Sequence, residues 1–268
     1  MSVEFLPADL APGDQKSLAL DTSSLEATRV RSASDPLFFL GYEKLWAEFG
    51  AAHEIEQREV LEKRLHWNPA MPQNGLALRY EMIVAISGGV FAAVRDHTVI
   101  VRDGAAIVHL SHSLVAPEWR RTGLAGWLRA WPVQTARECL SKSAAPITLV
   151  GEMEHVSPAG IPRLKAYEKA GFLKPDPRLV PYHQPDFRAP AEIDATGGPV
   201  PLPFALILRR VGHENEHTIS GAELRHIAHT LYAMYALEFR SQDMEPCWKL
   251  LGKFPAPDAS VPLVPPTA

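Results

Sequence analysis

The spacing of hydrophobic and polar positions changes several times along the chain and predicts both helices and strands. Between residues 35 and 49, apolar residues recur every three or four positions, which is typical of one face of an α-helix. Asp35 and Pro36 mark its start, because aspartate is a favoured cap and proline suits the first helical position. A second, heavily charged helix is predicted from about 51 to 66.

Segments rich in β-branched residues follow and predict antiparallel strands. The expected strands are 76–86, 90–94, 98–101 and 105–115, with turns at 87–89 and 95–97. Helices at about 123–141 and 161–170 then alternate with a buried strand at 147–153. This order predicts an α/β (α+β) fold, with a mixed central sheet of about six to seven strands and helices on both faces.

Proline is concentrated toward the end of the chain. Of the 24 prolines, eight lie between Pro175 and Pro203 and five between Pro255 and Pro266. Since proline lacks a backbone donor, these stretches predict loops, strand edges or tails. Among them, strands are expected at 180–187 and 204–211, and a capping box at Ser220 begins a helix that packs on the domain or on a second copy of the chain.

These changes in composition predict four segments. The first, 1–34, is a polar N-terminal arm with one short stretch, 17–25, of helical character. The main domain is expected at 35–211, a helical extension at 212–254 and a disordered tail at 255–268.

Composition excludes several classes of protein. Hydrophobic residues make up 46% of the chain and charged residues 22%, which is ordinary for a globular protein. A net charge of −4 argues against a binder of nucleic acid or of membrane surfaces. Two cysteines, Cys139 and Cys247, cannot form a disulfide framework. With no signal-peptide pattern and no apolar run of membrane-spanning length, we expect a cytoplasmic protein.

A basic turn precedes the helix expected at 123. The stretch LVAPEWRRTGLA, residues 114–125, contains a strand end, a proline and then Arg120 and Arg121. The start of a helix carries unpaired N–H groups and a positive potential, and small residues let a ligand approach them. The stretch therefore predicts an anion site, with pyrophosphate as the favoured ligand. A solvated, arginine-rich helix start is the alternative.

Two motifs together resemble one enzyme family. The pattern Arg120-x-x-Gly123-x-Ala125 resembles the acyl-CoA pyrophosphate signature of the GNAT (GCN5-related) N-acetyltransferase superfamily. The stretch YEKAGF, residues 167–172, resembles the helix-to-strand motif that comes later in that family. The resemblance covers roughly residues 36–211. It implies a transferase that uses acetyl-CoA as co-substrate and needs no metal.

The resemblance also implies roles for individual residues. Amides of the turn would bind the CoA pyrophosphate, while the strand before it would hold the pantetheine arm and offer a backbone N–H near Ser113 to the thioester carbonyl. Tyr167 matches the family tyrosine that protonates the departing thiolate. The implied cofactor-binding residues are Ser113, Leu114, Val115, Arg120, Arg121, Thr122, Gly123, Leu124, Ala125 and Gly126.

Several groups compete for the role of general base. Strand alternation places His109, Ser111 and Ser113 on one face, which we expect to line the cleft because polar residues are costly in a core. His109 stands where several family members place a basic glutamate, and its side chain titrates in a suitable range. Glu152 and Glu154, at the end of the next strand, are rivals, and an ordered-water relay is a further alternative.

The chain departs from the family pattern near the tyrosine motif. Many members carry an asparagine seven residues before that tyrosine, where this chain has Gly160 within the proline run 157–162. Pro132 lies inside the pyrophosphate helix, where it removes a hydrogen bond and should kink the helix.

Two His/Glu clusters, 53–56 and 213–217, lack the spacing of a zinc site, and no metal is expected. His53, Glu54 and Glu56 are instead candidates for the wall of the acceptor pocket, because the first two helices form that wall in the family.

The sequence thus predicts an N-acetyltransferase that moves an acetyl group to a small-molecule or protein amine by direct attack in a ternary complex. The alternative is a non-catalytic acyl-CoA sensor with the same fold.

Overall fold

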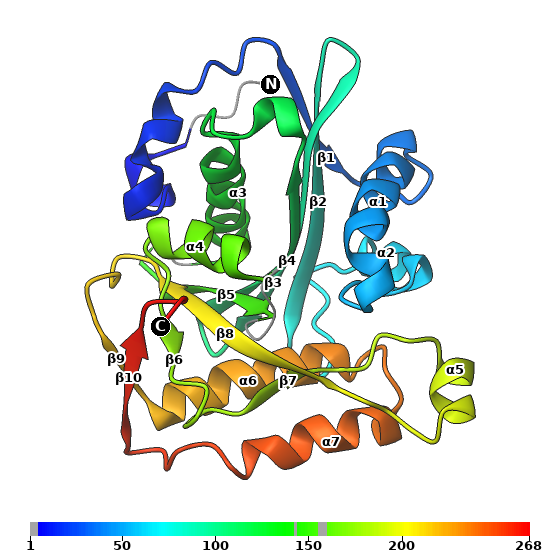
Figure 1. Ribbon diagram of the computed structural model, residues 1–268, viewed down its shortest axis with the longest axis vertical. Helices are drawn as coiled ribbons and strands as arrows, with labels where there is room; N and C mark the ends of the chain where they lie inside the picture. Colours follow the sequence, from blue (N-terminus) through cyan, green and yellow to red (C-terminus); the bar gives the residue numbers. More distant parts are fainter. Residues whose placement is uncertain (1–4, 142–143, 155–159) are drawn as a thin grey trace. The chain divides into compact units, whose positions relative to one another are not determined.

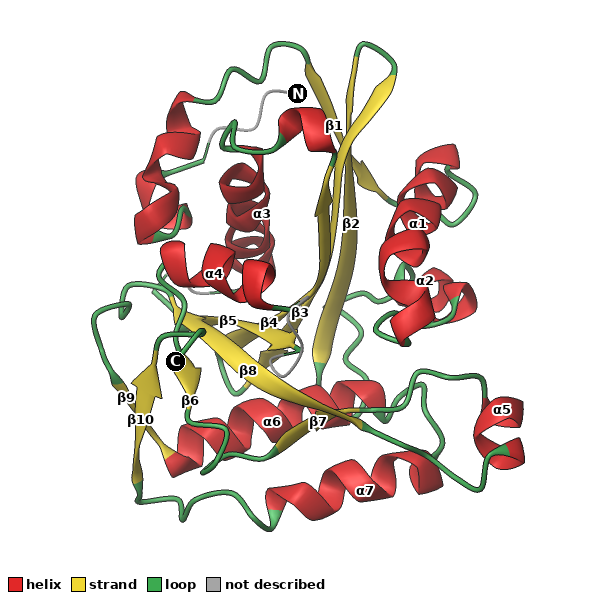
Figure 2. Ribbon diagram, in the orientation of Figure 1, coloured by secondary structure: helices red, strands yellow, loops and turns green. Residues whose placement is uncertain are grey.

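The computed structural model describes residues 5–141, 144–154 and 160–268. It forms two compact units, Met1–Ile147 and Thr148–Ala268. Figure 1 labels their elements, and Figure 2 distinguishes helices from strands. No helix in these described ranges is both long and apolar enough to span a membrane.

The first unit contains four antiparallel strands in chain order. They are β1 (Leu25–Val30), β2 (Ala77–Ser87), β3 (Val90–Arg102) and β4 (Ala105–Val115). The strands β2 and β4 agree with the prediction. The strand β1 was not predicted, and the expected helical stretch at 17–25 is instead a 3-10 helix that ends at Ala19.

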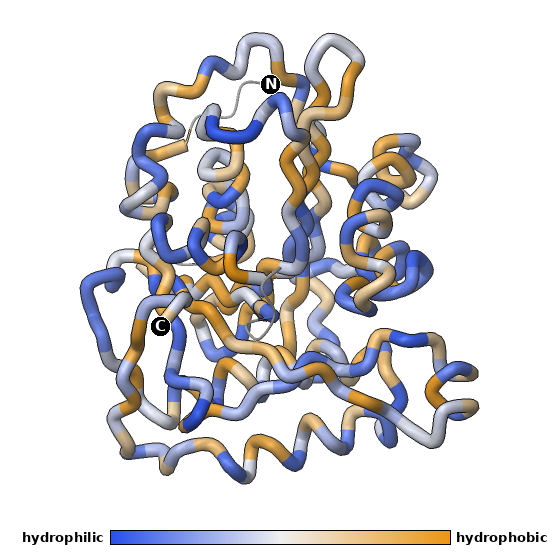
Figure 3. The backbone as a smooth tube through the Cα atoms, viewed as in Figure 1, coloured by the Kyte–Doolittle hydropathy of each residue, from blue (hydrophilic) through white to orange (hydrophobic). Residues whose placement is uncertain are grey.

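Helices α1 (Pro36–Phe49) and α3 (Leu124–Cys139) cover opposite faces of these strands (Figure 1). Asp35 caps α1 as predicted, since its carboxylate accepts a hydrogen bond from the backbone N–H of Leu37 at 2.9 Å. Figure 3 shows long hydrophobic stretches along the strands between the helices. One core cluster joins residues of α1 to Met82, Val84 and Val94, and another joins residues of α3 to Ile83, Ala85 and Ala93.

The second helix is much shorter than expected. The prediction of 51–66 is wrong before residue 58, because α2 spans only Arg58–Arg64. His53, at φ 55°, adopts the left-handed conformation that ends a helical path. The chain then buries Glu56, which forms an ion pair with the equally buried Arg64 at 2.6 Å.

No turn divides β3 at 95–97, although the polar residues there predicted one. Arg95, Asp96 and His97 are each 1% exposed or less and lie in a continuous strand. The carboxylate of Asp96 accepts hydrogen bonds from the Tyr80 hydroxyl at 3.0 Å and from the backbone N–H of His112 at 2.8 Å. Partners from adjacent strands therefore stabilise Asp96, although its segment looks like a turn when it is considered alone.

The second unit contains two small groups of antiparallel strands. The first has the order β5 (Ile147–Met153), β8 (Leu202–Arg210) and β7 (Tyr182–Gln184). The second has the order β6 (Lys174–Pro175), β10 (Ser260–Val264) and β9 (Thr218–Ser220). The prediction that residues 255–268 form a disordered tail is wrong for β10, in which Val261 is 1% exposed.

The helices of the second unit are α4 (Ile161–Lys169), α5 (Pro190–Ala195), α6 (Gly221–Tyr235) and α7 (Ser241–Leu251). The cap at Ser220 is confirmed, because its hydroxyl accepts a hydrogen bond from the Glu223 N–H at 3.1 Å. The described elements combine helices with mostly antiparallel strands, so the predicted α/β fold class is confirmed.

Candidate functional site

The turn before α3 has the geometry of an anion-binding loop. After a short 3-10 helix, η4 (Pro117–Trp119), the backbone passes through two left-handed residues, Arg121 at φ 68° and Gly123 at φ 106°. Thr122 fixes the turn, because its hydroxyl donates to the Trp119 carbonyl at 2.8 Å and accepts from the Leu124 N–H at 3.3 Å.

The donors at this turn fit a diphosphate. The first bond within α3 is donated by the Trp127 N–H to the Gly123 carbonyl at 3.0 Å, so the N–H groups of Ala125 and Gly126 precede it and have no intrahelical acceptor. Arg120 and Arg121 are exposed and add positive charge to that of the helix N-terminus. Backbone donors, a left-handed glycine and two guanidinium groups are the features of an anion-binding loop.

A β-bulge in β4 changes which residues share a face. Asp96 pairs with His112 and Thr98 pairs with His109, so two residues of β4 stand opposite His97. His109 and His112 therefore lie on one face, the face that α1 covers. Ser113 pairs with Arg95 on the opposite face, so the prediction that His109 and Ser113 share a face is wrong. Simple alternation cannot reveal a one-residue insertion in a strand.

The three residues that end β4 remain half-buried next to the turn. Ser113, Leu114 and Val115 pair with β3 through Arg95, Val94 and Ala93, in that order. The guanidinium group opposite Ser113 is 1% exposed, and no hydrogen-bond partner reaches its nitrogens within the described part of the chain. This buried positive charge was not predicted, because the polar run was interpreted as a turn.

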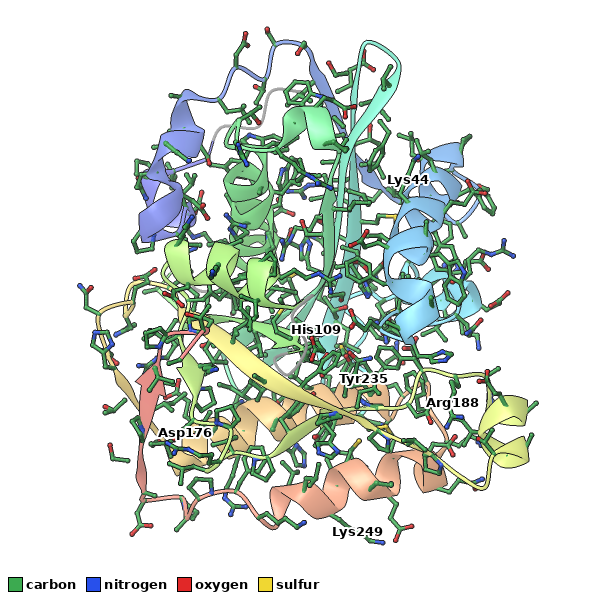
Figure 4. The ribbon with its side chains drawn as sticks, viewed as in Figure 1. Lys44, His109, Asp176, Arg188, Tyr235 and Lys249 are labelled. Atoms are coloured by element: carbon green, nitrogen blue, oxygen red, sulfur yellow. The ribbon has the colours of Figure 1, made fainter. Side chains whose placement is uncertain are left out.

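His109, labelled in Figure 4, is only 3% exposed. Its Nδ1 lies 3.2 Å from the hydroxyl oxygen of Ser111, the residue with which it was expected to line the cleft. The imidazole is thus held by a neighbour on the same strand, on the face of the sheet next to α1.

His112 is a second buried histidine on the same strand. Its Nδ1 lies 3.0 Å from the Asp96 carboxylate, and its Nε2 lies 3.0 Å from the carbonyl oxygen of Glu54. Although burial opposes the charged imidazole, the carboxylate outweighs it and raises the pKa of His112 to about 9. The protonated ring joins β4 to the loop between α1 and α2.

The candidate acceptor-wall residues lie in that loop. His53 is exposed, Glu54 contributes its carbonyl to the contact with His112, and Glu56 is buried against Arg64. In the second predicted cluster, His213 pairs with Glu216 at 2.7 Å. Over the described ranges, no group of three or more His, Cys, Asp or Glu side chains is arranged to hold a metal ion.

Tyr167 lies in the last turn of α4, in the second unit. Its half-buried ring contacts Phe172 edge-on, with ring centroids 5.0 Å apart at an angle of 79°. Gly171, at φ 88°, turns the chain between them, and the Phe172 N–H donates to the Tyr167 carbonyl at 3.0 Å. The helix end predicted from the motif is therefore confirmed.

Glu152, on β5, lies between two buried tyrosines. The hydroxyls of Tyr182 and Tyr235 each donate to one of its carboxylate oxygens at 2.5 Å; Tyr235 is labelled in Figure 4. Burial, followed by the nearby carboxylate, raises the pKa of Tyr182 well above its usual value, so this phenol remains a donor. The arrangement stabilises the ionised carboxylate of Glu152.

Glu154 explains the unusual glycine before α4. A Cβ atom added at Gly160 would lie 2.4 Å from the Glu154 carbonyl oxygen and 2.6 Å from its Oε2. No larger residue, including the family asparagine, fits there without a shift of the backbone. The rest of the proline run before it, residues 157–159, lies outside the described residues.

The predicted residues thus fall into two sets. The ten cofactor-binding candidates and His109 belong to the first unit, while Tyr167, Glu152 and Glu154 belong to the second.

No protein-family model matches this sequence, and a comparison with curated proteins gives no match. Solved structures of acetyltransferases are similar to it in fold. A protein from Bacteroides thetaiotaomicron assigned as a GNAT-family acetyltransferase is 17% identical, with 69% of this chain and 86% of that chain covered at a TM-score of 0.43.

Two further structures were solved with small molecules bound. N-acetylglutamate synthase from Neisseria gonorrhoeae, with coenzyme A and N-acetylglutamate, is 12% identical over 70% of this chain and 35% of that chain, at a TM-score of 0.41. The aminoglycoside acetyltransferase meta-AAC0020 from an uncultured soil metagenomic sample was solved with sisomicin. It is 16% identical over 53% of this chain and 86% of that chain, at a TM-score of 0.39.

Proposed function

We propose that this protein is an N-acetyltransferase that transfers the acetyl group of acetyl-CoA to an amine by direct attack in a ternary complex. The observation that carries the proposal is the turn from Arg120 to Gly126. Its left-handed glycine, helix N–H groups without intrahelical acceptors and exposed arginines belong to the motif by which the sequence resembles the GNAT superfamily.

In the proposed reaction, a C–N bond forms between the amine and the acetyl group, and the C–S bond of the thioester breaks. Acetyl-CoA supplies the activated thioester. A backbone N–H near Ser113 donates a hydrogen bond to the thioester carbonyl oxygen, where negative charge develops. His109, Glu152, Glu154 or an ordered water accepts the proton from the amine. The Tyr167 hydroxyl donates a proton to the leaving sulfur, and the products are the acetylated amine and CoA thiol.

His109 is the base candidate that the geometry favours. Two buried tyrosine hydroxyls donate to Glu152, and donors to a carboxylate favour its ionised form and weaken it as a proton acceptor. His109 instead contacts a hydroxyl, Ser111, and lies on the sheet face next to α1, which in the family borders the acceptor.

The test is a titration of the purified full chain with acetyl-CoA, followed by an acceptor screen. Ligand at 100 times its Kd should stabilise the fold by ~2.7 kcal/mol in a thermal-shift measurement. Release of free thiol is then measured over a panel of small amines and peptides. Thiol release with one acceptor class supports the proposal. Binding without release from any acceptor would favour the acyl-CoA sensor, and no binding would refute both.

A further inference from the structure

The N-terminal segment runs along α3 and ends at the candidate pyrophosphate turn (Figure 1). Two short 3-10 helices form it, η1 (Pro7–Asp9) and η2 (Pro12–Ala19). Leu10 and Ala11, between them, are 2% and 1% exposed. Phe5 contacts the rings of two α3 tryptophans edge-on, each with centroids 5.5 Å apart. The segment therefore packs on the first unit as an ordered part of it.

Two ion pairs attach this segment to one face of α3. Asp14 accepts two hydrogen bonds from Arg129, both at 2.7 Å, and Asp9 forms an ion pair with Arg137. The arginines are eight positions apart, which is close to two helical turns and places them on the same face. Because the earlier aspartate pairs with the later arginine, the segment runs antiparallel to α3 and approaches its N-terminus.

The segment crosses the helix at Gly126. A Cβ atom there would lie 2.4 Å from the hydroxyl oxygen of Ser17 and 2.7 Å from Oδ1 of Asp14. A glycine thus lets the segment come this close to the first turn of α3. From this position the Ser17 hydroxyl, 2% exposed as a residue, donates a hydrogen bond to the Gly123 carbonyl at 2.8 Å.

The hydrogen bond from Ser17 holds a turn whose backbone is otherwise costly to maintain. Arg121 has φ 68°, a conformation that residues other than glycine rarely adopt and that persists only when the surrounding structure holds it. The other side-chain bonds to the turn come from within it, through Arg120 and Thr122. Over the described residues, Ser17 is the side chain that bonds to this turn from a distant part of the chain.

We propose that Ser17 is a positioning residue for coenzyme A, which fixes Gly123 so that the amides of the turn are arranged for a diphosphate before the ligand binds. The inference rests on the proposed function for the identity of the ligand, but the order that Ser17 imposes on the turn is a property of the free protein. Preorganised donors bind more tightly because the ligand need not order them.

The first measurement is amide hydrogen exchange of the ligand-free full chain. In Ser17→Ala, exchange of residues 121–126 should rise severalfold, because one hydrogen bond that holds the turn is lost. The matched control is Asp9→Asn, which weakens the same segment at its contact with Arg137, far from the turn, and should leave exchange at 121–126 unchanged. Unchanged exchange in Ser17→Ala, or equal increases in both variants, would overturn the inference.

The second measurement compares CoA with pantetheine, which lacks the pyrophosphate, by titration calorimetry. Ser17→Ala should weaken CoA binding about fivefold, the equivalent of one ordinary hydrogen bond, and leave pantetheine affinity unchanged. Equal weakening of both ligands would contradict the positioning role. If exchange rises as expected and no variant or native protein binds CoA, the proposed function fails while the role of Ser17 in ordering the turn stands.

Discussion

The imidazole of His112 and the carboxylate of Asp96 form a buried pair, with Nδ1 3.0 Å from Oδ1. The partners lie on adjacent strands, and the carboxylate also accepts a hydrogen bond from the Tyr80 hydroxyl. The other imidazole nitrogen contacts the carbonyl of Glu54 in the loop that follows α1. One protonated side chain thus couples the central strands of the first unit to a loop proposed to border the acceptor.

This pair should make stability depend on pH in a defined window. The pKa of His112 is raised to about 9 in the folded state, mainly by the carboxylate of Asp96 against the effect of burial. The stabilisation is therefore fully present below the unfolded value of about 6.5 and is lost as pH rises through 9. The pKa of Asp96 is lowered, so its own contribution disappears only in acid.

Urea unfolding from pH 5.5 to 10.5 measures this effect in the native protein and in His112→Gln. The free energy of unfolding of the native protein should fall relative to that of the variant by on the order of 3 kcal/mol between pH 6 and 10. His53→Gln, which removes an exposed histidine, serves as the control and should follow the native curve. Parallel curves for the native protein and His112→Gln would show that the pair does not titrate in this window.

Gly123→Val should abolish CoA binding. A Cβ atom at Gly123 would lie 3.5 Å from both Cα and Oγ of Ser17, so a branched side chain would disturb the contact that holds the turn, and valine does not readily adopt φ 106°. Gly104→Val is a matched control, because Gly104 has φ 80° in the turn between β3 and β4 and no atom within 4 Å of an added Cβ. Both variants should lose roughly 1–3 kcal/mol of stability, and only Gly123→Val should lose affinity in titration calorimetry. Unchanged affinity in Gly123→Val would refute the assigned turn.

Gly160→Ala should destabilise the protein by roughly 1–3 kcal/mol, because its Cβ would overlap the Glu154 carbonyl and the backbone must shift. Gly252→Ala is the control: this glycine also has right-handed helical torsions, and the nearest atom to an added Cβ is 3.3 Å away. Alanine there should cost much less stability than at Gly160, because the contact is longer by almost 1 Å. Thermal unfolding of both variants measures the difference in stability. Equal melting temperatures would mean that the backbone at Gly160 shifts without a loss of stability.

Structural features set by local interactions could be predicted from the sequence, whereas features set by distant contacts could not. The cap at Asp35, the turn from Arg120 to Gly123 and the helix end at Gly171 are each set by residues within a few positions, and all were predictable. The strand β1 exists because it pairs with β2, more than fifty positions later, so a polar segment gave no sign of it.

The register of β4 and the burial of polar residues in β3 could not be predicted from the sequence either. The bulge opposite His97 shifts the faces of β4 by one residue, and no local pattern distinguishes it from regular alternation. The buried run that contains Arg95 and Asp96 has the composition of a turn, and the partners of Asp96 come from β2 and β4. The candidate site residues were therefore identified from sequence motifs. Their neighbours Ser17, His112 and Tyr235 could be identified only from the structure.

Tyr167→Phe should lower turnover far more than it lowers affinity for acetyl-CoA. The substitution keeps the ring and its edge-on contact with Phe172, so packing at the end of α4 is retained and only the hydroxyl is lost. Loss of a general acid typically costs on the order of 100-fold in rate. Phe172→Leu is the control, since it disturbs the same contact but keeps the hydroxyl, and it should reduce stability more than turnover. Thiol release and calorimetry on both variants separate the roles: full activity in Tyr167→Phe would make Tyr167 a packing residue and leave protonation of the thiolate to another group or to water.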